Sequence, residues 1–326
     1  MYRLALVAAT AAAASVWPQP ASMTSGNASI VVGGCDGAPF RFTTNAPNST
    51  VLAAAFARYP KLLFPHAFDP ALERDDAAPA PDDDWSAACL GALHVVVDDA
   101  SDAHPQLDTD ESYALEVPAA DGATATARAA TVYGALRALE TFSQLVAWAP
   151  DLEDWTAGGY VIEGAPVAVA DAPRFAHRGL MIDTSRHYQP VAMIRAAVDA
   201  LAYAKLNVLH WHVVDAPSFP FESRTTKALW KGAYARRATY SHSDVAAVVE
   251  HARLRGVRVV VEFDMPGHAD SWCVGYARGG GGGDEKREAR ARSPSSGRSG
   301  ASACPRSARA RRARRRSTSR ATARSR

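Results

Sequence analysis

Three apolar segments of this 326-residue sequence each end in polar side chains of the kinds that enzymes use as acids, bases and cations. The segments cover residues 177–185, 206–215 and 257–263. The polar residues in and after them are Asp183, Arg186, His210, His212, Asp215, Glu262, Asp264 and His268. Carboxyl and imidazole groups can transfer protons near neutral pH, and a guanidinium group is a permanent cation with several donors. The three ends together predict an active site, although each residue taken singly could instead be a buried polar residue that ties loops together.

The segments between these ends have helical patterns. A helix is expected from Pro190, and a second one from a capping-box-like start at 241–244 to Gly256. Segments that are apolar on both faces and alternate with helices are typical of a parallel sheet, and no glycine loop of the nucleotide-binding type is present. We therefore predict the start of a (β/α)8 TIM barrel, in which the C-terminal ends of the strands form one rim.

His210 and His212 also suggest a metal pair, because alternate residues of a strand share a face. No cysteine or third histidine completes a ligand set at clear spacing. The sequence therefore favours a site without a metal ion or another cofactor.

Residues 16–165 are expected to form a separate N-terminal α+β domain. Strand-like runs occur at 93–99 and 112–117, and a helix is predicted over about 126–147. In that helix one apolar face would lie on the sheet and is made by Val132, Leu136, Leu139 and Phe142. Cys35 and Cys89 lie in the same domain and could form a disulfide, whereas Cys273 and Cys304 have no evident partner.

The two ends of the chain have compositions unlike the rest. Residues 1–15 have the layout of a secretory signal peptide, and the sequons at Asn27 and Asn48 fit a glycoprotein of the secretory pathway, either lysosome-like or extracellular. No run approaches the roughly 20 apolar residues of a membrane span. Residues 279–326 form a Gly-, Arg- and Ser-rich tail that we predict to be disordered.

The charge of that tail raises nucleic-acid binding as an alternative function. Residues 284–326 hold 15 Lys and Arg against 3 Asp and Glu, whereas residues 1–283 hold 21 against 31. Clustered positive charge attracts phosphates of any sequence. Because the tail lacks interleaved aromatic residues and the signal peptide directs the chain away from nucleic acid, no nucleic-acid partner is expected.

Two long stretches make a family resemblance specific. They read RGLMIDTSRHYQPVAMIRAAVDALAYAKLNVLHWHVVDAPSFPFES and VVEHARLRGVRVVVEFDMPGHADSW. This region, from about Arg174 to Trp272, resembles the first part of the catalytic barrel of glycoside hydrolase family 20, the β-N-acetylhexosaminidases. VWPQP and ALETFSQL resemble the family's N-terminal domain. We therefore expect the barrel domain to cover residues 173–278.

The resemblance implies roles for three residues. Arg186 would bind sugar hydroxyls at the floor of the pocket, and Asp215 with His268 would support the catalytic acid without touching the substrate. Trp211 and Trp272 would pack beside the site or in the core. The family removes terminal N-acetyl-hexosamine from glycans by substrate-assisted, retaining hydrolysis, in which the substrate's acetamido oxygen attacks the anomeric carbon and a Glu protonates the leaving oxygen. Intact members could also be homodimers.

The catalytic Asp and Glu of the family lie in a GGDE motif after the fourth strand. Here GGDE occurs at 282–285, after a glycine run and with no apolar strand before it, and its Asp284 is only 20 positions after Asp264. Since a βαβ crossover needs a helix in that space, we interpret Asp284 and Glu285 as a coincidence and as weak candidates for the pair. The sequence thus predicts a hexosaminidase truncated within its barrel, after about three β/α units, and inactive. The alternative is a non-catalytic protein that binds N-acetyl sugars or a partner subunit.

Overall fold

The computed structural model describes residues 15–33, 35, 38–65, 88–150 and 158–277. Residues 1–14 of the predicted signal peptide, the predicted tail, Cys304, Asp284 and Glu285 lie outside these residues. The chain divides into two compact units, here called the first and second units. The first contains the described residues within Met1–Leu180, Ala196–Val208 and Glu250–Arg258, and the second those within Met181–Arg195, Leu209–Val249 and Val259–Arg326.

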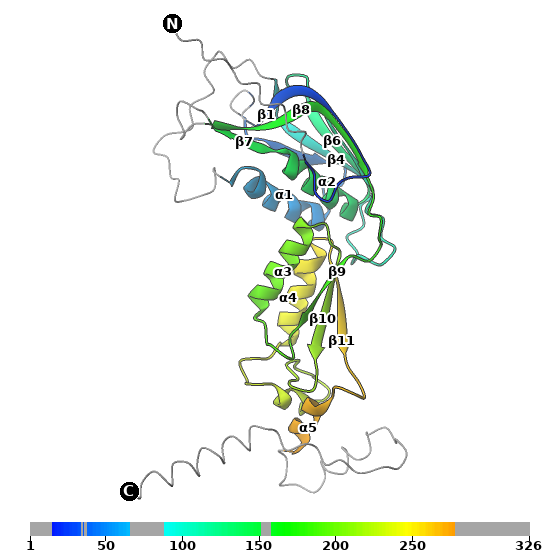
Figure 1. Ribbon diagram of the computed structural model, residues 1–326, viewed down its shortest axis with the longest axis vertical. Helices are drawn as coiled ribbons and strands as arrows, with labels where there is room; N and C mark the ends of the chain where they lie inside the picture. Colours follow the sequence, from blue (N-terminus) through cyan, green and yellow to red (C-terminus); the bar gives the residue numbers. More distant parts are fainter. Residues whose placement is uncertain (1–14, 34, 36–37, 66–87, 151–157, 278–326) are drawn as a thin grey trace, which may run out of the picture. The chain divides into compact units, whose positions relative to one another are not determined.

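The first unit contains an eight-stranded mixed sheet. Seven of its strands lie in the order β2-β4-β6-β5-β8-β1-β3, and β7 pairs with β8. The strands are β1 (Ser22–Val32), β2 (Arg41–Thr44), β3 (Cys89–Leu90), β4 (Ala92–Asp99), β5 (Tyr113–Val117), β6 (Thr124–Thr131), β7 (Ala147–Pro150) and β8 (Gly158–Asp171). Helices α1 (Thr50–Leu63) and α2 (Val132–Leu145) lie together on one side of this sheet (Figure 1).

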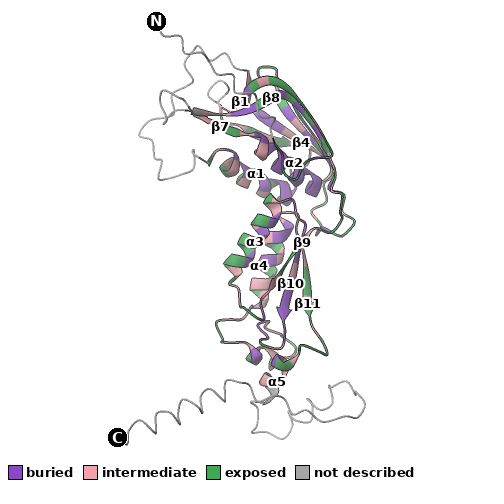
Figure 2. Cartoon of the chain, viewed as in Figure 1, coloured by how far each residue is buried: buried purple, intermediate pink, exposed green. Residues whose placement is uncertain are grey.

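The core of the first unit lies between that sheet and its two helices. Alternate residues of β4 and β5 are buried, and α2 is buried along most of its length (Figure 2). The predicted face of α2 is in this core, with Val132, Leu136, Leu139 and Phe142 at most 2% exposed. The strands predicted at 93–99 and 112–117 correspond to β4 and β5, so the α+β prediction for this region is confirmed.

The helix predicted over 126–147 begins too early. Residues 124–131 form strand β6, in which the small residues Ala125, Ala127 and Ala129 are buried alternately. Thr131 then accepts hydrogen bonds from the amides of Tyr133 and Gly134, which makes it the N-cap of α2. A short run of alanine and threonine fits both the two-residue period of a strand and the 3.6-residue period of a helix. The cap at Thr131 decides where the strand ends and the helix begins.

A disulfide joins Cys35 to Cys89, with their Cα atoms 5.7 Å apart. It closes a loop of 54 residues between the end of β1 and the start of β3. The pairing suggested by the sequence is therefore confirmed.

A buried ionic cluster ties distant segments of the first unit together. Glu111 Oε2 accepts from Arg137 Nε at 2.6 Å and from Arg178 Nη2 at 2.7 Å, and its Oε1 accepts from Asn207 Nδ2 at 2.7 Å. Arg137 is 2% exposed and also donates to the Gly256 carbonyl at 2.9 Å. Burial opposes ionisation of Glu111, but the two guanidinium groups hold its pKa below the ordinary value. We call Glu111, Arg137, Arg178 and Asn207 the Glu111 cluster.

The remaining elements include a three-stranded sheet in the order β11-β10-β9. In chain order these elements are β9 (Gly179–Asp183), α3 (Val191–Tyr203), β10 (Val208–Val214), the 3-10 helix η4 (Leu229–Gly232), α4 (His242–Arg253), β11 (Arg258–Phe263) and α5 (Asp270–Ala277). A helix follows each of the first two strands, as predicted. Gly256, after α4, has a φ of +67°, a conformation that glycine adopts without steric cost.

The strands β9 and β10 run parallel, and so do β10 and β11, in which the amide of Arg258 donates to Asn207 and Glu262 lies beside His210. The amide of Val208 donates to Arg178 at one end of the β9 and β10 pair, and the amide of Thr184 donates to His212 at the other. Residue numbers rise together along both strands, as in a parallel ladder. Among the described residues these strands do not close a barrel, which agrees with the predicted incomplete TIM barrel. None of the described helices is long and apolar enough to cross a membrane.

Candidate active site

The turn after β9 orients Arg186. Asp183, the last residue of β9, accepts from the backbone amides of Ser185 and Arg186 at 3.0 Å each. Its other carboxylate oxygen pairs with Arg186 Nη1 at 2.6 Å. Burial opposes ionisation of Asp183, but these hydrogen bonds lower its pKa below the ordinary value. The carboxylate therefore fixes both the backbone and the side chain of the arginine.

Asp215 follows β10 and is the buried centre of the site, only 1% exposed. Its Oδ2 lies 2.7 Å from Arg186 Nη2, 3.0 Å from His212 Nε2 and 3.0 Å from His268 Nδ1. The amide of Ala216 donates to Oδ1. Burial opposes ionisation, but the Ala216 amide, the two imidazoles and the guanidinium together hold the pKa of Asp215 below its ordinary value. Asp215 is therefore an ionised acceptor shared by three side chains.

His268 lies in the loop after β11, and its side chain is 60% exposed. Its φ of +59° is uncommon for a residue other than glycine. Ser271, at the start of α5, donates to the Asp215 carbonyl at 2.6 Å. The loop after β11 thus bonds the side chain of Asp215, and the start of α5 bonds its backbone. Only one ring nitrogen of His268 is used by that carboxylate.

His210, His212 and Glu262 join β10 to β11. Glu262 Oε2 lies 2.5 Å from His210 Nε2 and 2.8 Å from His212 Nδ1. The hydrogen bond with His212 holds the pKa of Glu262 well below its ordinary value. Burial lowers the pKa of His212, but Glu262 and Asp215 outweigh it and raise that pKa above its ordinary value.

All eight residues predicted at the strand ends lie together. Seven are linked by the contacts above, and the carboxylate of Asp264 lies near His212 and Asp215. The sequence did not reveal Ser271, the Ala216 amide or Tyr234, whose hydroxyl donates to the Arg186 carbonyl at 3.2 Å. These are single polar groups in loops, with no spacing pattern that would have marked them.

One group of described residues has ligand atoms spaced for a metal ion. One atom each from His212, Asp215 and Asp264 lies within 4.8 Å of the others. However, the His212 and Asp215 atoms are already bonded to each other, and Asp215 also pairs with the Arg186 cation. A cation among the carboxylates takes the place that a metal ion would need, so the donor set fits an ion-pair cluster better.

The two tryptophans near the site pack among apolar residues. Trp211 is fully buried, donates from Nε1 to Thr184 at 3.0 Å and contacts Tyr240 edge to face. Trp272 packs against Phe219 with ring centroids 5.5 Å apart. For Trp211 the core role is confirmed.

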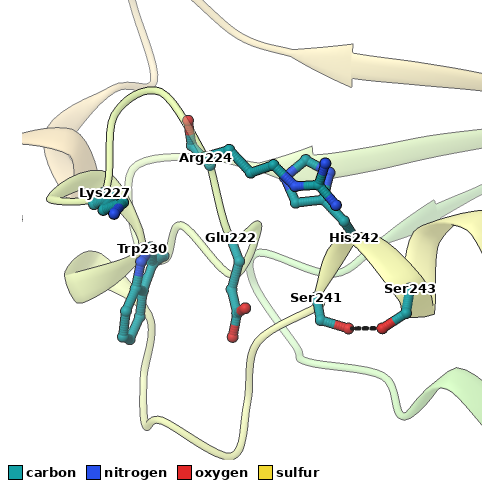
Figure 3. A pocket seen from close by; sticks show the side chains of 8 residues that line it. Glu222, Arg224, Lys227, Trp230, Ser241, His242 and Ser243 are labelled. Carbon is teal, nitrogen blue, oxygen red and sulfur yellow. Dashed lines mark hydrogen bonds between the residues drawn. The ribbon is translucent and has the colours of Figure 1, made fainter.

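A hollow of about 420 Å³ lies on the long loop between β10 and α4 (Figure 3). Its lining includes Glu222, Arg224, Lys227, Trp230 and His242, none of which is among the predicted site residues. Arg224 forms no ion pair with the described residues, and the structure gives no bond that ties it to Arg186 or Asp215. It therefore offers a control arginine for tests of the site.

Comparisons with known proteins give the family of this chain. The glycosyl hydrolase family 20 catalytic domain matches residues 175–307, and a domain described as beta-acetyl hexosaminidase like matches residues 16–145. The chain belongs to glycoside hydrolase family 20, as the resemblance predicted. The catalytic-domain match includes Asp284 and Glu285.

Relatives of known function are about twice as long as the region they share with this chain. Beta-hexosaminidase 1 of Arabidopsis thaliana is 41% identical over 267 residues, which are 80% of this chain and 47% of that protein. Beta-hexosaminidase subunit beta of Rattus norvegicus is 40% identical over 283 residues, which are 84% and 49% of the two chains. The chain thus spans about half the length of the curated relatives it matches.

Solved structures agree with this assignment. The chitobiase of Flavobacterium johnsoniae has a TM-score of 0.61 and 26% identity, covering 81% of this chain and 36% of the chitobiase. A glycoside hydrolase family 20 beta-N-acetylglucosaminidase has a TM-score of 0.54 and 25% identity, and the match covers 80% of this chain and 44% of that protein.

Proposed function

We propose that this chain carries part of the active site of a glycoside hydrolase that removes terminal N-acetyl-hexosamine from glycans by substrate-assisted, retaining hydrolysis. The observation that carries the proposal is the convergence of Arg186, Asp215 and His268, from three strand ends, in a chain of this family. The names of the relatives support the same reaction, because they are beta-hexosaminidases.

In this proposal Arg186 binds the hydroxyl groups of the sugar. Its side chain is 42% exposed, while Asp183 and Asp215 hold one terminal nitrogen each. A guanidinium group has five N–H donors, so donors remain for a ligand after both carboxylates are satisfied. Because Asp183 and Asp215 are both ionised, they hold the Arg186 guanidinium group in one orientation before the sugar binds. This reduces the entropy that binding costs.

Asp215 and His268 would support the proton donor. An ionised Asp215 that accepts from His268 Nδ1 fixes the tautomer with the Nδ1 proton, so His268 Nε2 is the free acceptor. A carboxyl group placed against that nitrogen could give its proton to the glycosidic oxygen and later act as the base for water. The substrate's acetamido oxygen would be the nucleophile at the anomeric carbon.

The acid and the aspartate that steadies the acetamido group are the open part of the proposal. Asp284 and Glu285 remain candidates because the catalytic-domain match includes them, although they lie outside the described residues. If Asp284 and Glu285 are not the catalytic pair, the second proposal is a non-catalytic protein that binds N-acetyl sugars or a partner subunit.

Two further features are proposed with the function. The sequence of residues 1–15 supports a secretory-pathway location, in a lysosome-like compartment or outside the cell. N-acetyl-hexosamine-terminated glycans are the proposed ligands, and a homodimer is proposed for intact members of the family.

Turnover of a chromogenic N-acetyl-β-glucosaminide tests the reaction. The chain should be expressed in a secretory host, beside Arg186→Ala and Glu285→Gln. Turnover that both substitutions abolish would support the hydrolase and assign Glu285 as the acid. Sugar binding that depends on Arg186, without turnover, would support the non-catalytic alternative. A folded chain that shows no turnover and no Arg186-dependent sugar binding would overturn both the hydrolase and the sugar-binding alternative.

A further inference from the structure

His212 has a carboxylate at each ring nitrogen. Its Nε2 lies 3.0 Å from Asp215 Oδ2 and its Nδ1 lies 2.8 Å from Glu262 Oε2. The imidazole is almost completely buried, with a side chain 6% exposed. A neutral imidazole has one N–H donor and one lone pair, so it can satisfy only one of two ionised carboxylates.

Protonation of a neighbouring carboxylate would be the other way to satisfy both contacts. Asp215 already accepts from Arg186, His268 and the Ala216 amide, all of which favour its ionised form. Glu262 also lies 2.5 Å from His210, so a second donor favours its ionised form. The simplest arrangement therefore keeps both carboxylates charged and places the proton on His212.

The charges facing this imidazole favour the same arrangement. The titratable and charged neighbours of the cluster are Asp183, Arg186, His210, Asp215, Glu262, Asp264 and His268. If every histidine were neutral, one guanidinium would face four carboxylates. Arg186 Nη1 lies 3.3 Å from His212 Nε2 and can only donate, so this contact opposes a proton on Nε2. It is longer than the contacts with Asp215 and Glu262, at 3.0 and 2.8 Å, which favour the imidazolium.

We propose that His212 is a positioning residue, held as an imidazolium between Glu262 and Asp215, which fixes Asp215 in the orientation that binds Arg186 and His268. This inference deepens the proposed function and rests on it for its role in catalysis. Glu262 on β11 holds His212 on β10, and His212 in turn holds the carboxylate that directs His268. His212 and Glu262 would thus act on the reaction through Asp215, without touching the sugar.

Nitrogen-15 NMR of the full chain with labelled histidine tests the proposal, because an imidazolium and the two neutral tautomers have different ring-nitrogen shifts. Single His→Gln variants assign the signals. At pH 7 we expect both nitrogens of His212 to have imidazolium shifts. In the Glu262→Gln variant we expect the titration midpoint of His212 to fall by about 1 pH unit or more, because His212 loses one of its two anionic partners.

The signal of His268 separates positioning from a simple charge effect. If His212 positions Asp215, His212→Gln weakens the contact between Asp215 and His268, so the single Nδ1–H tautomer of His268 is lost. Removal of the charge of His212 alone would leave that tautomer in place. His94→Gln is the matched control, since His94 bonds Thr43 outside this cluster.

Two results would overturn the proposal. One is a neutral, single-tautomer His212 at pH 7 in the unmodified chain. The other is a His268 signal that keeps its single Nδ1–H tautomer in folded His212→Gln and Glu262→Gln variants. If His212→Gln does not fold, Glu262→Gln still provides the test. The side chain of Glu262 is 35% exposed, and glutamine has the same shape as glutamate. No sugar is needed, so failure of the proposed function would appear separately, as the absence of Arg186-dependent sugar binding.

Discussion

Arg186 Nη2 lies 2.7 Å from the Oδ2 atom of Asp215, which joins the turn after β9 to the end of β10. The contact is asymmetric, since the carboxylate is buried and the guanidinium side chain is 42% exposed. Asp215 therefore acts from inside the protein to hold a cation at its surface. This is the geometry expected of a ligand-binding arginine with a buried support.

Replacing Asp215 with Asn should destabilise the protein and loosen the site. The amide keeps the shape but removes the charge that binds Arg186, His212 and His268, and its NH2 group would face donors. We expect the free energy of unfolding to fall by about 1–3 kcal/mol, as for the loss of charged hydrogen bonds. Urea unfolding measures this change. Asp183→Asn, at a more exposed carboxylate, should cost less, and an equal or larger cost there would contradict the central role of Asp215.

Replacing Glu111 with Ala should cause a larger loss. Arg137 would remain almost completely buried without its carboxylate, and breaking a buried ion pair costs about 3–5 kcal/mol. Glu116→Ala on β5 is a suitable control, because that side chain is exposed and forms no ion pair among the described residues. Thermal and urea unfolding should show the loss for Glu111 and a change within about 0.5 kcal/mol for Glu116. Equal effects would mean that the Glu111 cluster does not stabilise the first unit.

Loss of the disulfide between Cys35 and Cys89 should lower stability by about 2–5 kcal/mol. The bond restricts the unfolded chain by closing a loop of 54 residues. Urea unfolding of the Cys35→Ala/Cys89→Ala double variant measures the effect. Cys273→Ala removes a free cysteine and should leave the urea midpoint nearly unchanged. If added reductant changed the unmodified chain but not the double variant, the disulfide would be the cause.

The stability contributed by Glu262 should depend on pH in both directions. Its pKa is lowered on folding, so its contribution is complete above about pH 4.5 and is lost as pH falls toward about 2. The pKa of His212 is raised on folding, so its contribution is complete below about pH 6.5 and is lost as pH rises through its folded-state value. The difference in unfolding free energy between the unmodified chain and Glu262→Gln should be largest between these limits. A difference that did not vary with pH would refute the coupling.

Much of the site was predictable from the sequence because its residues follow strands. In a parallel sheet the ends of successive strands meet at one edge, so Asp183, Asp215 and Glu262 could be placed together without knowing their contacts. The order of those contacts was not predictable. Which nitrogen of His212 faces which carboxylate depends on side-chain rotamers and on the loop that contains His268, and neither follows from spacing.

The fold of the first unit shows a different limit. The apolar periodicity of α2 predicted the face that is buried, but its start depended on a cap at Thr131 after a run that fits both strand and helix. No pattern in the sequence predicted the Glu111 cluster. Its members are spread from residue 111 to residue 207, and no local pattern relates residues so far apart.

Titration of the full chain with N-acetylglucosamine, followed by NMR, tests the central claim most directly. The account predicts that the signals of Arg186 and His268 change with added sugar. It also predicts that binding is lost in Arg186→Ala and kept in Arg224→Ala, where the arginine lies in the separate hollow of Figure 3. Absence of binding by the folded chain, or binding that Arg186→Ala leaves intact, would contradict the assignment of this cluster as a sugar site.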